Sequence, residues 1–331
     1  MKILVIGFGS IGRQHIRNLK VCDKKFSIAL LRKHTKDKDL GDCQALVDHV
    51  FFDERQALQW KPEAAVVCNP APLHIPTAIG CARAGAHLFI EKPLSNSLRG
   101  LETLVRECRR RKLTVMVGYL LRFSPGLRAV KKILSQKKVG RVLWMEAVVG
   151  HNLKRWRPGR DYRHTVSAHK NLGGGVLWEL SHEIDYVTSL GGELKQLSAQ
   201  VDKLSDLKMD APDFCELNME FKNKVRARIH LDMFDHARQR FCRIVGTQGT
   251  LVWDLLKNHN VALLREGGAW ETIFASTIFD RNQMYVDQFA HFFNCIRRKT
   301  VPVVGLKEGR RVVDIVLAAH KSARLQKTVS V

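Results

Sequence analysis

The sequence predicts an α/β fold in which a doubly wound parallel sheet is followed by a second domain of successive strands and flanking helices. Two observations lead to this prediction. In residues 1–120, apolar runs of strand length alternate with helical segments, which is typical of a parallel sheet covered on both faces. From residue 121 onward, strand-like runs follow one another with only turn residues between them. We therefore predict a first domain over 1–120 and a second over 121–331.

The predicted elements follow from these patterns in chain order. In the first domain, strands are predicted over 2–6, 26–31, 50–52, 64–68, 87–90 and 114–118, and helices over 13–20, 54–60, 74–85 and 98–111. In the second domain, helices are predicted over 124–136, 173–190, 284–299 and 307–325. Its strands are predicted over 141–150, 197–204, 214–221, 225–234, 240–247, 249–254 and 261–266.

The composition bears on whether the protein is globular, membrane-spanning or disulfide-bonded. Hydrophobic residues make up 45% and charged residues 26% of the chain, which is ordinary for a globular protein. No run of about 18 apolar residues occurs, and the N-terminal apolar run is too short for a signal peptide, so we expect no membrane partner. The eight cysteines are scattered without a CxxC motif. We expect reduced thiols and a cytoplasmic protein.

The formal net charge of +23 raises the question of nucleic-acid binding. The cations lie in short runs that are far apart, mostly on the polar faces of predicted helices, and no nucleic-acid-binding motif accompanies them. We therefore interpret them as solvated surface and expect no nucleic-acid partner. Attraction of an anionic substrate or cofactor is the second interpretation.

A glycine motif follows the first predicted strand. In the stretch GFGSIG, Gly7, Gly9 and Gly12 match the pattern G-x-G-x-x-G. Gly7 permits a tight turn, Gly9 lets the backbone approach a pyrophosphate, and Gly12 permits close packing of helix on strand. The backbone N–H groups leading into the helix, which include Ser10 and Ile11, would bind the phosphates. Placed between a strand and a helix, this motif predicts a dinucleotide site; the alternative is a glycine-rich turn without a ligand.

The residues after the second strand bear on which dinucleotide binds. An NAD-binding protein usually has Asp or Glu here to bind the ribose 2′-hydroxyl. This chain has Arg32 and Lys33, and no acid before Asp37. Because cations suit a 2′-phosphate, we expect NADP(H) to be preferred, with NAD(H) as the other possible cofactor and a plain basic loop as the alternative.

A lysine follows the fifth predicted strand in the stretch Glu91-Lys92-Pro93. Ligands of doubly wound sheets bind at the carboxyl ends of the strands. We therefore expect Lys92 to face the cofactor site, where desolvation and nearby cations would ease the loss of its proton.

Three glycines precede a series of acid, histidine and acid in GGGVLWELSHEIDY. The glycines allow the backbone to pass close to a ligand or a neighbouring segment. Glu179, His182 and Asp185 would share one face of the predicted helix. A metal site is disfavoured because no other histidine or cysteine has a convincing spacing, and a buried structural histidine is a further alternative. We favour His182 as a general acid and base, with Glu179 or Asp185 fixing its tautomer.

Several motifs together resemble a known family. GFGSIG at the N-terminus, NPAPLH, EKPLS, GYLLRFSP and GGGVLWELSHEID look like the glucose–fructose oxidoreductase, inositol dehydrogenase and rhizopine-catabolism family. The resemblance covers essentially the whole chain. It implies a Rossmann domain followed by an α/β domain whose large, mostly antiparallel sheet forms a homodimer or homotetramer interface.

The resemblance also implies roles for individual residues. Lys92 would orient the substrate and assist proton transfer, and His182 would be the catalytic histidine, with Glu179 where the family usually has Asp. Residues assigned to the cofactor site are Asn69, Pro70, His74, Glu91 and Arg122. The family's acid usually lies four residues before the histidine, whereas Glu179 lies three before His182.

The loop before the glycines combines cations with aromatic residues. Arg160 and Arg163 lie near Trp156 and Tyr162. Aromatic faces stack on sugar rings, and guanidinium groups bind carboxylate or phosphate through two hydrogen bonds. The stretch WRPGRDYR resembles a family branch associated with surface polysaccharides, so we expect an anionic or nucleotide-linked sugar; a basic surface loop is the alternative.

The function expected from these patterns is NADP(H)- or NAD(H)-dependent hydride transfer to or from a sugar carbon that bears a hydroxyl or keto oxygen. Two alternatives come from relatives of the same family. One is glycoside cleavage with a cofactor that is not consumed, and the other is a non-catalytic regulator that binds the dinucleotide.

Overall fold

The structure is a computed structural model that describes residues 1–33, 39–276 and 279–331. It comprises two compact units. The first contains Met1–Leu120 and Arg281–Val313, and the second contains Leu121–Asp280 and Asp314–Val331. The sequence analysis placed one boundary after residue 120; the structure adds that a C-terminal segment belongs to the first unit.

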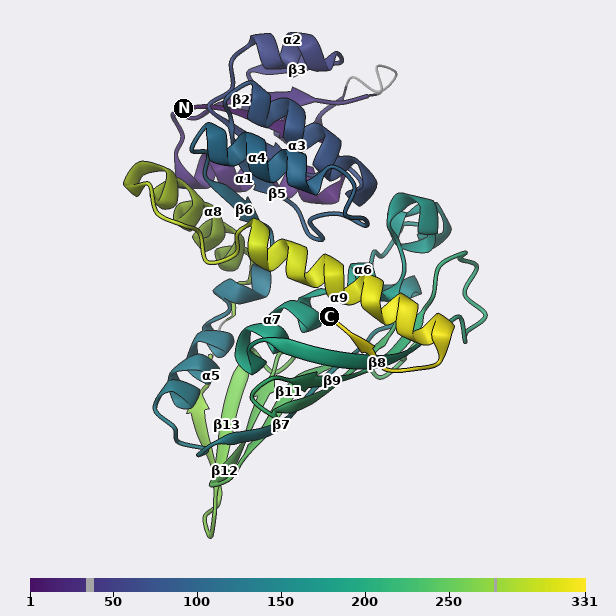
Figure 1. Ribbon diagram of the computed structural model, residues 1–331. Coiled ribbons are helices and arrows are strands. Elements are labelled where there is room, and N and C mark those ends of the chain that lie inside the picture. Colours follow the sequence, from purple (N-terminus) through teal and green to yellow (C-terminus); the bar gives the residue numbers. More distant parts are fainter. Residues whose placement is uncertain (34–38, 277–278) are drawn as a thin grey trace. The chain divides into compact units, whose positions relative to one another are not determined.

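The first unit contains a six-stranded parallel sheet in the order β3-β2-β1-β4-β5-β6 (Figure 1). The strands are β1 Lys2–Ile6, β2 Ser27–Leu31, β3 His49–Phe51, β4 Ala64–Val67, β5 His87–Ile90 and β6 Val115–Val117. All six strands predicted from the sequence are present. Because β1 pairs with both β2 and β4, successive crossovers diverge beside β1. This is the switch point at which such sheets bind ligands.

Helices cover this sheet, which explains its continuous apolar strands. They are α1 Ser10–Cys22, α2 Glu54–Gln59, α3 His74–Arg83, α4 Leu101–Arg110 and α8 Arg281–Arg298. Helix α1 packs against α8. The buried stripe of α1 includes Gly12, His15, Ile16 and Leu19, spaced as one helical face requires. None of the described helices combines the length and apolarity that crossing a bilayer requires.

The second unit contains a nine-stranded sheet in the order β14-β13-β12-β11-β7-β10-β9-β8-β15. Its strands are β7 Val142–Gly150, β8 Leu194–Asp202, β9 Phe214–Phe221, β10 Arg226–Asp232, β11 Gln239–Gly246, β12 Gly249–Asp254, β13 Asn260–Arg265, β14 Trp270–Phe274 and β15 Val329–Ser330. β7 and β10 run parallel, and the other neighbours pair antiparallel. The expected mostly antiparallel sheet is confirmed. The sequence analysis missed β14, whose first three residues are exposed, and β15, which has two residues.

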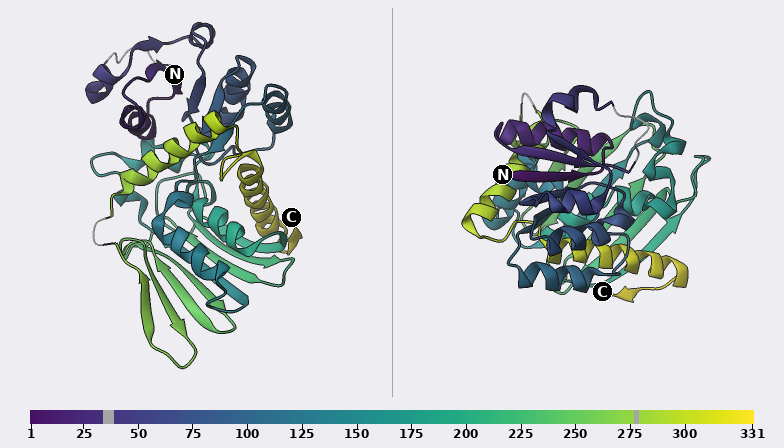
Figure 2. Two further views of the ribbon diagram at one scale, coloured as in Figure 1. Left: turned by 90° about the vertical axis from the view of Figure 1, so that its left-hand side faces the viewer. Right: turned by 90° about the horizontal axis from the view of Figure 1, so that it is seen from above.

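Helices α5 Pro125–Ser135, α6 Val176–Glu179 and α7 His182–Gly191 pack against this sheet (Figures 1 and 2). α9, Leu306–Leu325, begins in the first unit and ends in the second. The Ser124 hydroxyl caps α5, and Pro125 occupies its first turn. The single helix predicted over 173–190 is wrong, because the chain breaks at Leu180 and Ser181 into α6 and α7.

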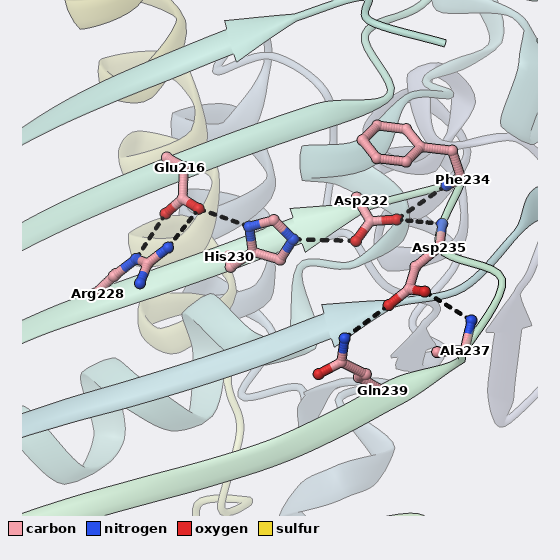
Figure 3. Close-up of polar contacts among 8 residues, drawn as sticks. All are labelled: Glu216, Arg228, His230, Asp232, Phe234, Asp235, Ala237 and Gln239. Carbon is pink, nitrogen blue, oxygen red and sulfur yellow. Dashed lines mark hydrogen bonds and ion pairs between the residues drawn. The ribbon is translucent and has the colours of Figure 1, made fainter. Parts of the chain in front are cut away.

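An acid–histidine–acid cluster lies on β9 and β10 (Figure 3). The two ring nitrogens of His230 lie 2.6 Å from Glu216 Oε1 and 3.0 Å from Asp232 Oδ2. Arg228 donates two hydrogen bonds to Glu216, and Asp232 also accepts the backbone N–H groups of Phe234 and Asp235. The cluster therefore links two strands to the turn that follows β10.

We expect His230→Gln to lower the free energy of unfolding by about 1 kcal/mol at pH 6, and by less at pH 9. The hydrogen bond to Asp232 raises the pKa of His230, against the effect of burial, and Glu216 raises it further. A raised pKa in the folded state gives stability that is present below the unfolded-state pKa and is lost as the pH rises through the folded-state pKa. Urea unfolding at both pH values measures the difference. His164→Gln, at a side chain 84% exposed, is the control; a penalty for His230→Gln that grows with pH would contradict the expectation.

Candidate active site

The glycine turn of the first unit is shaped by close backbone contacts. Gly7 has φ +103°, and a Cβ there would lie 2.8 Å from the Asn69 nitrogen. A Cβ at Gly12 would collide with the carbonyl oxygen of Gly7. A Cβ at Gly9, in contrast, would meet no atom within 4 Å. Gly7 and Gly12 are therefore required by the turn itself, whereas the open space at Gly9 fits the approach of a pyrophosphate.

The start of α1 complements this space. The helix begins at Ser10, and its N-cap, Gly9, has no side chain to accept the first N–H groups. Uncapped N–H groups and the positive end of the helix dipole favour a phosphate. The predicted positions Ser10 and Ile11 therefore lie in the first turn of α1, where they fit a dinucleotide.

Two arginines flank Phe8 within the glycine turn. The guanidinium carbon of Arg13 lies 4.0 Å from the Phe8 ring centroid, and that of Arg32 lies 5.2 Å from it. Arg13 also donates to the Leu40 carbonyl oxygen. The Nη1 atom of Arg32 is buried without a hydrogen-bond partner in the described part of the chain. Cations thus gather at the ends of β1 and β2. Asp37, the first acid after β2 in the sequence, lies outside the described residues.

The loops after β4 and β5 are joined by His74. This histidine is buried, and its two ring nitrogens lie 2.7 Å from the Asn69 oxygen and 2.8 Å from the Pro93 oxygen. Burial lowers the pKa of His74, and the two carbonyl contacts oppose that effect. Asn69 in turn donates to the Thr77 hydroxyl. The His74 ring therefore holds the loop that contains Asn69 and Pro70 against the segment that contains Lys92.

Glu91 and Arg122 were assigned to the cofactor site. In the structure, each is hydrogen-bonded to another side chain of the protein. The carboxylate of Glu91 lies 2.6 Å from His15 Nε2 and accepts the backbone N–H of Lys92. In the second unit, Arg122 donates from Nε and Nη2 to the two carboxylate oxygens of Asp185, at 2.6 and 2.9 Å. The Arg122 and Asp185 side chains are only 6% and 2% exposed. Two residues with separate predicted roles thus form one buried ion pair.

The triple glycine lets one backbone segment pass close to another. A Cβ at Gly174 would collide with the Val166 carbonyl oxygen, and Gly175 has φ +102°. The N–H groups of Gly174 and Gly175 donate to the carbonyl oxygens of His169 and Ser167. The neighbouring segment is therefore the preceding loop, which the glycines bind to the start of α6.

Glu179 and His182 lie on either side of the helix break. Glu179 is the last residue of α6, and His182 is the first residue of α7. The shared helical face expected for Glu179, His182 and Asp185 therefore does not apply to Glu179. Among the described residues, no group of three or more His, Cys, Asp or Glu side chains is arranged to hold a metal ion.

A shallow pocket lies in the basic aromatic loop, with about 200 Å³ of empty space that includes open solvent. It is lined by Leu153, Trp156, Arg157, Arg160, Tyr162, Thr165 and Ser167. Three of the predicted substrate residues, Trp156, Arg160 and Tyr162, are thus brought together. The fourth, Arg163, binds Asp161 through its guanidinium group. The sequence analysis missed Ser167, whose buried hydroxyl has no hydrogen-bond partner within the described segments.

Two family models match the chain. Residues 1–119 match the oxidoreductase family with an NAD-binding Rossmann fold, and residues 127–252 match the GFO/IDH/MocA C-terminal domain. The chain belongs to the GFO/IDH/MocA family. The resemblance found in its motifs is confirmed, and this membership makes the glycine turn of the first unit part of an NAD-binding Rossmann fold.

Individual GFO/IDH/MocA relatives are similar over the full chain. A myo-inositol 2-dehydrogenase of Thermotoga maritima is 23% identical over 99% of this chain and 98% of its own. A levoglucosan dehydrogenase solved in complex with NADH has a TM-score of 0.90 and 17% identity, covering 100% and 99% of the two chains. The WlbA dehydrogenase of Bordetella pertussis, solved with NADH and UDP-GlcNAcA, has a TM-score of 0.85 and 19% identity, covering 100% of this chain and 97% of its own. At these identities, the solved structures confirm the fold.

Proposed function

We propose that this GFO/IDH/MocA protein is an NADP(H)-dependent oxidoreductase that acts on a hydroxyl or keto carbon of a sugar-like substrate. The observation that carries the proposal is the glycine turn at the switch point of the parallel sheet, which leaves open space at Gly9 beside an uncapped helix N-terminus. When bound, the dinucleotide accepts or returns the hydride. The side chains of this chain position the substrate and transfer the proton.

Lys92 and His182 serve the same reaction in this proposal. In the oxidation direction, His182 takes the proton of the substrate hydroxyl. The carbon that carries this hydroxyl loses its hydride, which leaves a ketone. Lys92 donates a hydrogen bond to that oxygen. In the reduction direction, His182 returns the proton. A screen of oxidised and reduced cofactors against sugars, sugar acids and nucleotide sugars, followed by nicotinamide absorbance, tests the function. Bound dinucleotide without net turnover on any sugar would contradict it.

The cations around Phe8 support the proposed preference for NADP(H). A 2′-phosphate would place two negative charges near Arg32 and Lys33, and the buried Arg32 Nη1 atom lacks a partner within the described segments. The relatives solved with NADH show that the fold itself also accepts the non-phosphorylated cofactor. The preference therefore depends on this chain's own residues after β2.

We expect NADPH to bind at least about 10-fold more tightly than NADH, because one charge-assisted hydrogen bond to a phosphate contributes about 1.5–3 kcal/mol. Replacing Arg32 and Lys33 with alanine should remove most of the difference and leave NADH affinity nearly unchanged. Dissociation constants from the quenching of protein fluorescence measure both effects. Tighter binding of NADH by the unmodified protein would refute the preference.

The pocket of the basic aromatic loop supports an anionic sugar as substrate. Its roughly 200 Å³ of empty space includes open solvent, so the pocket is a shallow surface site and does not enclose a whole ligand. It can contact one end group of a larger molecule. Arg157 and Arg160 suit a carboxylate or phosphate, and the Ser167 hydroxyl can donate a further hydrogen bond.

We expect Arg160→Ala to raise the KM for an anionic sugar about 10-fold and to change kcat less than about 2-fold, because the lost contact binds substrate and transition state alike. Lys154→Ala is the matched control, since this exposed cation lies in the same loop and does not line the pocket. Initial rates on the sugar acid and its neutral parent sugar separate charge recognition from a general defect. An unchanged KM on the acid would remove the pocket from the substrate site.

The protein would act in the cytoplasm as a homodimer or homotetramer that associates through the large sheet. All eight cysteines are free thiols, which suits a reducing compartment. The β9–β10 face carries partly exposed aromatic and charged side chains, including Phe214, Glu216 and Arg228. Sedimentation equilibrium tests the assembly, and a monomer at micromolar concentration would contradict it.

A further inference from the structure

Directly before Lys92, the first unit contains a buried pair that the proposed reaction does not use. His15 Nε2 on α1 lies 2.6 Å from Glu91 Oε1 at the end of β5. The His15 side chain is 0% exposed and that of Glu91 is 11% exposed. Burying an acid and a base costs desolvation free energy even when they are hydrogen-bonded to each other. The presence of this pair therefore needs an explanation.

The surroundings of His15 determine how its proton is placed. The rings of Phe89, Tyr285 and Phe289 meet the imidazole edge to face, with centroids 5.0–6.0 Å away. The Nδ1 atom is buried and has no hydrogen-bond partner among the residues that the structure describes. Nε2 is therefore the ring nitrogen that donates to the Glu91 carboxylate.

Glu91 consequently remains an anion. Burial raises its pKa, but the hydrogen bond from His15, the charge of His15 and the charge of Lys92 act in the opposite direction, and the resulting pKa is lower than usual. Its second oxygen, Oε2, accepts the backbone N–H of Lys92 at 3.1 Å. Gly118 leaves room for the carboxylate, since a Cβ there would lie 3.1 Å from Glu91 Oε1. Both oxygens are thus held in place.

We propose that His15 and Glu91 are positioning residues that keep a fixed carboxylate anion beside Lys92, so that Lys92 acts as an ammonium donor to the substrate oxygen. This inference rests on the proposed function of Lys92. It also reverses the sequence-based expectation that the surroundings of Lys92 ease the loss of its proton. A neighbouring anion favours the charged ammonium, which donates a stronger hydrogen bond than a neutral amine.

Other groups also face the carboxylate. His74 from α3, Cys68 after β4 and Tyr285 from α8 each interact electrostatically with Glu91. Burial raises the pKa of Cys68 and of Tyr285, so both are neutral near pH 7. Among these four side chains, Glu91 is therefore the anion. Its removal should have the largest effect on the electrostatic potential at Lys92.

The decisive measurement compares Glu91→Gln with the unmodified protein. Lysines are reductively methylated with ¹³C-formaldehyde, and the NMR signal of Lys92, assigned by its loss in Lys92→Arg, is titrated. We expect the midpoint of this signal to fall by about one pH unit in Glu91→Gln. The alkaline limb of the kcat profile should move by a similar amount.

Substitutions at His15 separate positioning from folding. Leucine removes the donor and should reproduce the shift, whereas glutamine can still donate to Glu91 and should restore most of the original midpoint. Lower thermal stability with unchanged midpoints in His15→Leu and Glu91→Gln would overturn the inference. An inactive Lys92→Ala variant alongside unchanged midpoints would refute the pair's role and retain the proposed function, whereas an active Lys92→Ala variant would refute the function. If Glu91→Gln does not fold, the two His15 variants decide.

Discussion

We expect Lys92→Ala to lower kcat about 100- to 1,000-fold on the preferred sugar, because loss of one positioned hydrogen-bond donor to the reacting oxygen costs about 10²–10³-fold and Lys92 also orients the substrate. Lys92 follows β5, and the segment around it is held by two independent anchors. The Glu91 carboxylate accepts its backbone N–H, and the Pro93 carbonyl oxygen contacts His74. These anchors fix the backbone from which the Lys92 side chain extends.

Steady-state kinetics on purified protein measure the effect of Lys92→Ala. The dissociation constant for the cofactor should stay within about 3-fold of the original, since the phosphates are bound at the glycine turn. Lys24→Ala, an exposed lysine of the same unit, is the control and should be fully active. Activity of Lys92→Ala equal to that of the unmodified protein in every assay would favour a non-catalytic regulator.

The second large effect is expected at His182. His182→Asn should lower kcat about 100- to 10,000-fold and should remove one limb of the pH profile of kcat/KM, because that limb reports the general base. His164→Asn, at an exposed histidine of the same unit, should leave both limbs in place. A full pH profile in His182→Asn would assign the base to another residue.

The two acids near His182 are expected to respond differently to substitution. Asp185 is engaged by Arg122 through two hydrogen bonds, so Asp185→Asn should chiefly destabilise the second unit. Glu179 ends α6, three residues before His182, and we expect it to support the histidine tautomer. A shift of the His182 limb in Glu179→Gln, without a comparable loss of stability, would distinguish them. The reverse pattern would assign the support to Asp185.

The fold was predictable because its elements follow from short-range patterns. Residues 2–6 are apolar at every position but the first, and a run of this kind has few alternatives to a buried strand. The six parallel strands and most strands of the second unit were found in this way. β14 and β15 were not, because an exposed strand and a two-residue strand carry no periodic signal. The break at Leu180 was missed because each side of it has the composition of a helix.

The candidate site was predictable only where the local backbone geometry requires one particular residue type. Gly7 and Gly12 indicated a tight turn because a Cβ at either position would collide with backbone, and Gly9 indicated a phosphate site because it leaves open space there. Pairings between distant residues were not predictable. His15 could have been noticed as a histidine on the apolar stripe of α1, yet its partner lies 76 residues away.

The sequence by itself determined the order of strands and helices, the family and the residue types available for chemistry. The tertiary structure alone decided which ionisable side chains pair with one another. Glu91 pairs with His15, Asp185 with Arg122, and Glu216 with both Arg228 and His230. The physical reason is that local patterns record burial and backbone conformation, which each residue experiences with its neighbours in the chain. Ion pairs form between residues that meet only after folding, and their strength depends on distance and solvent exposure.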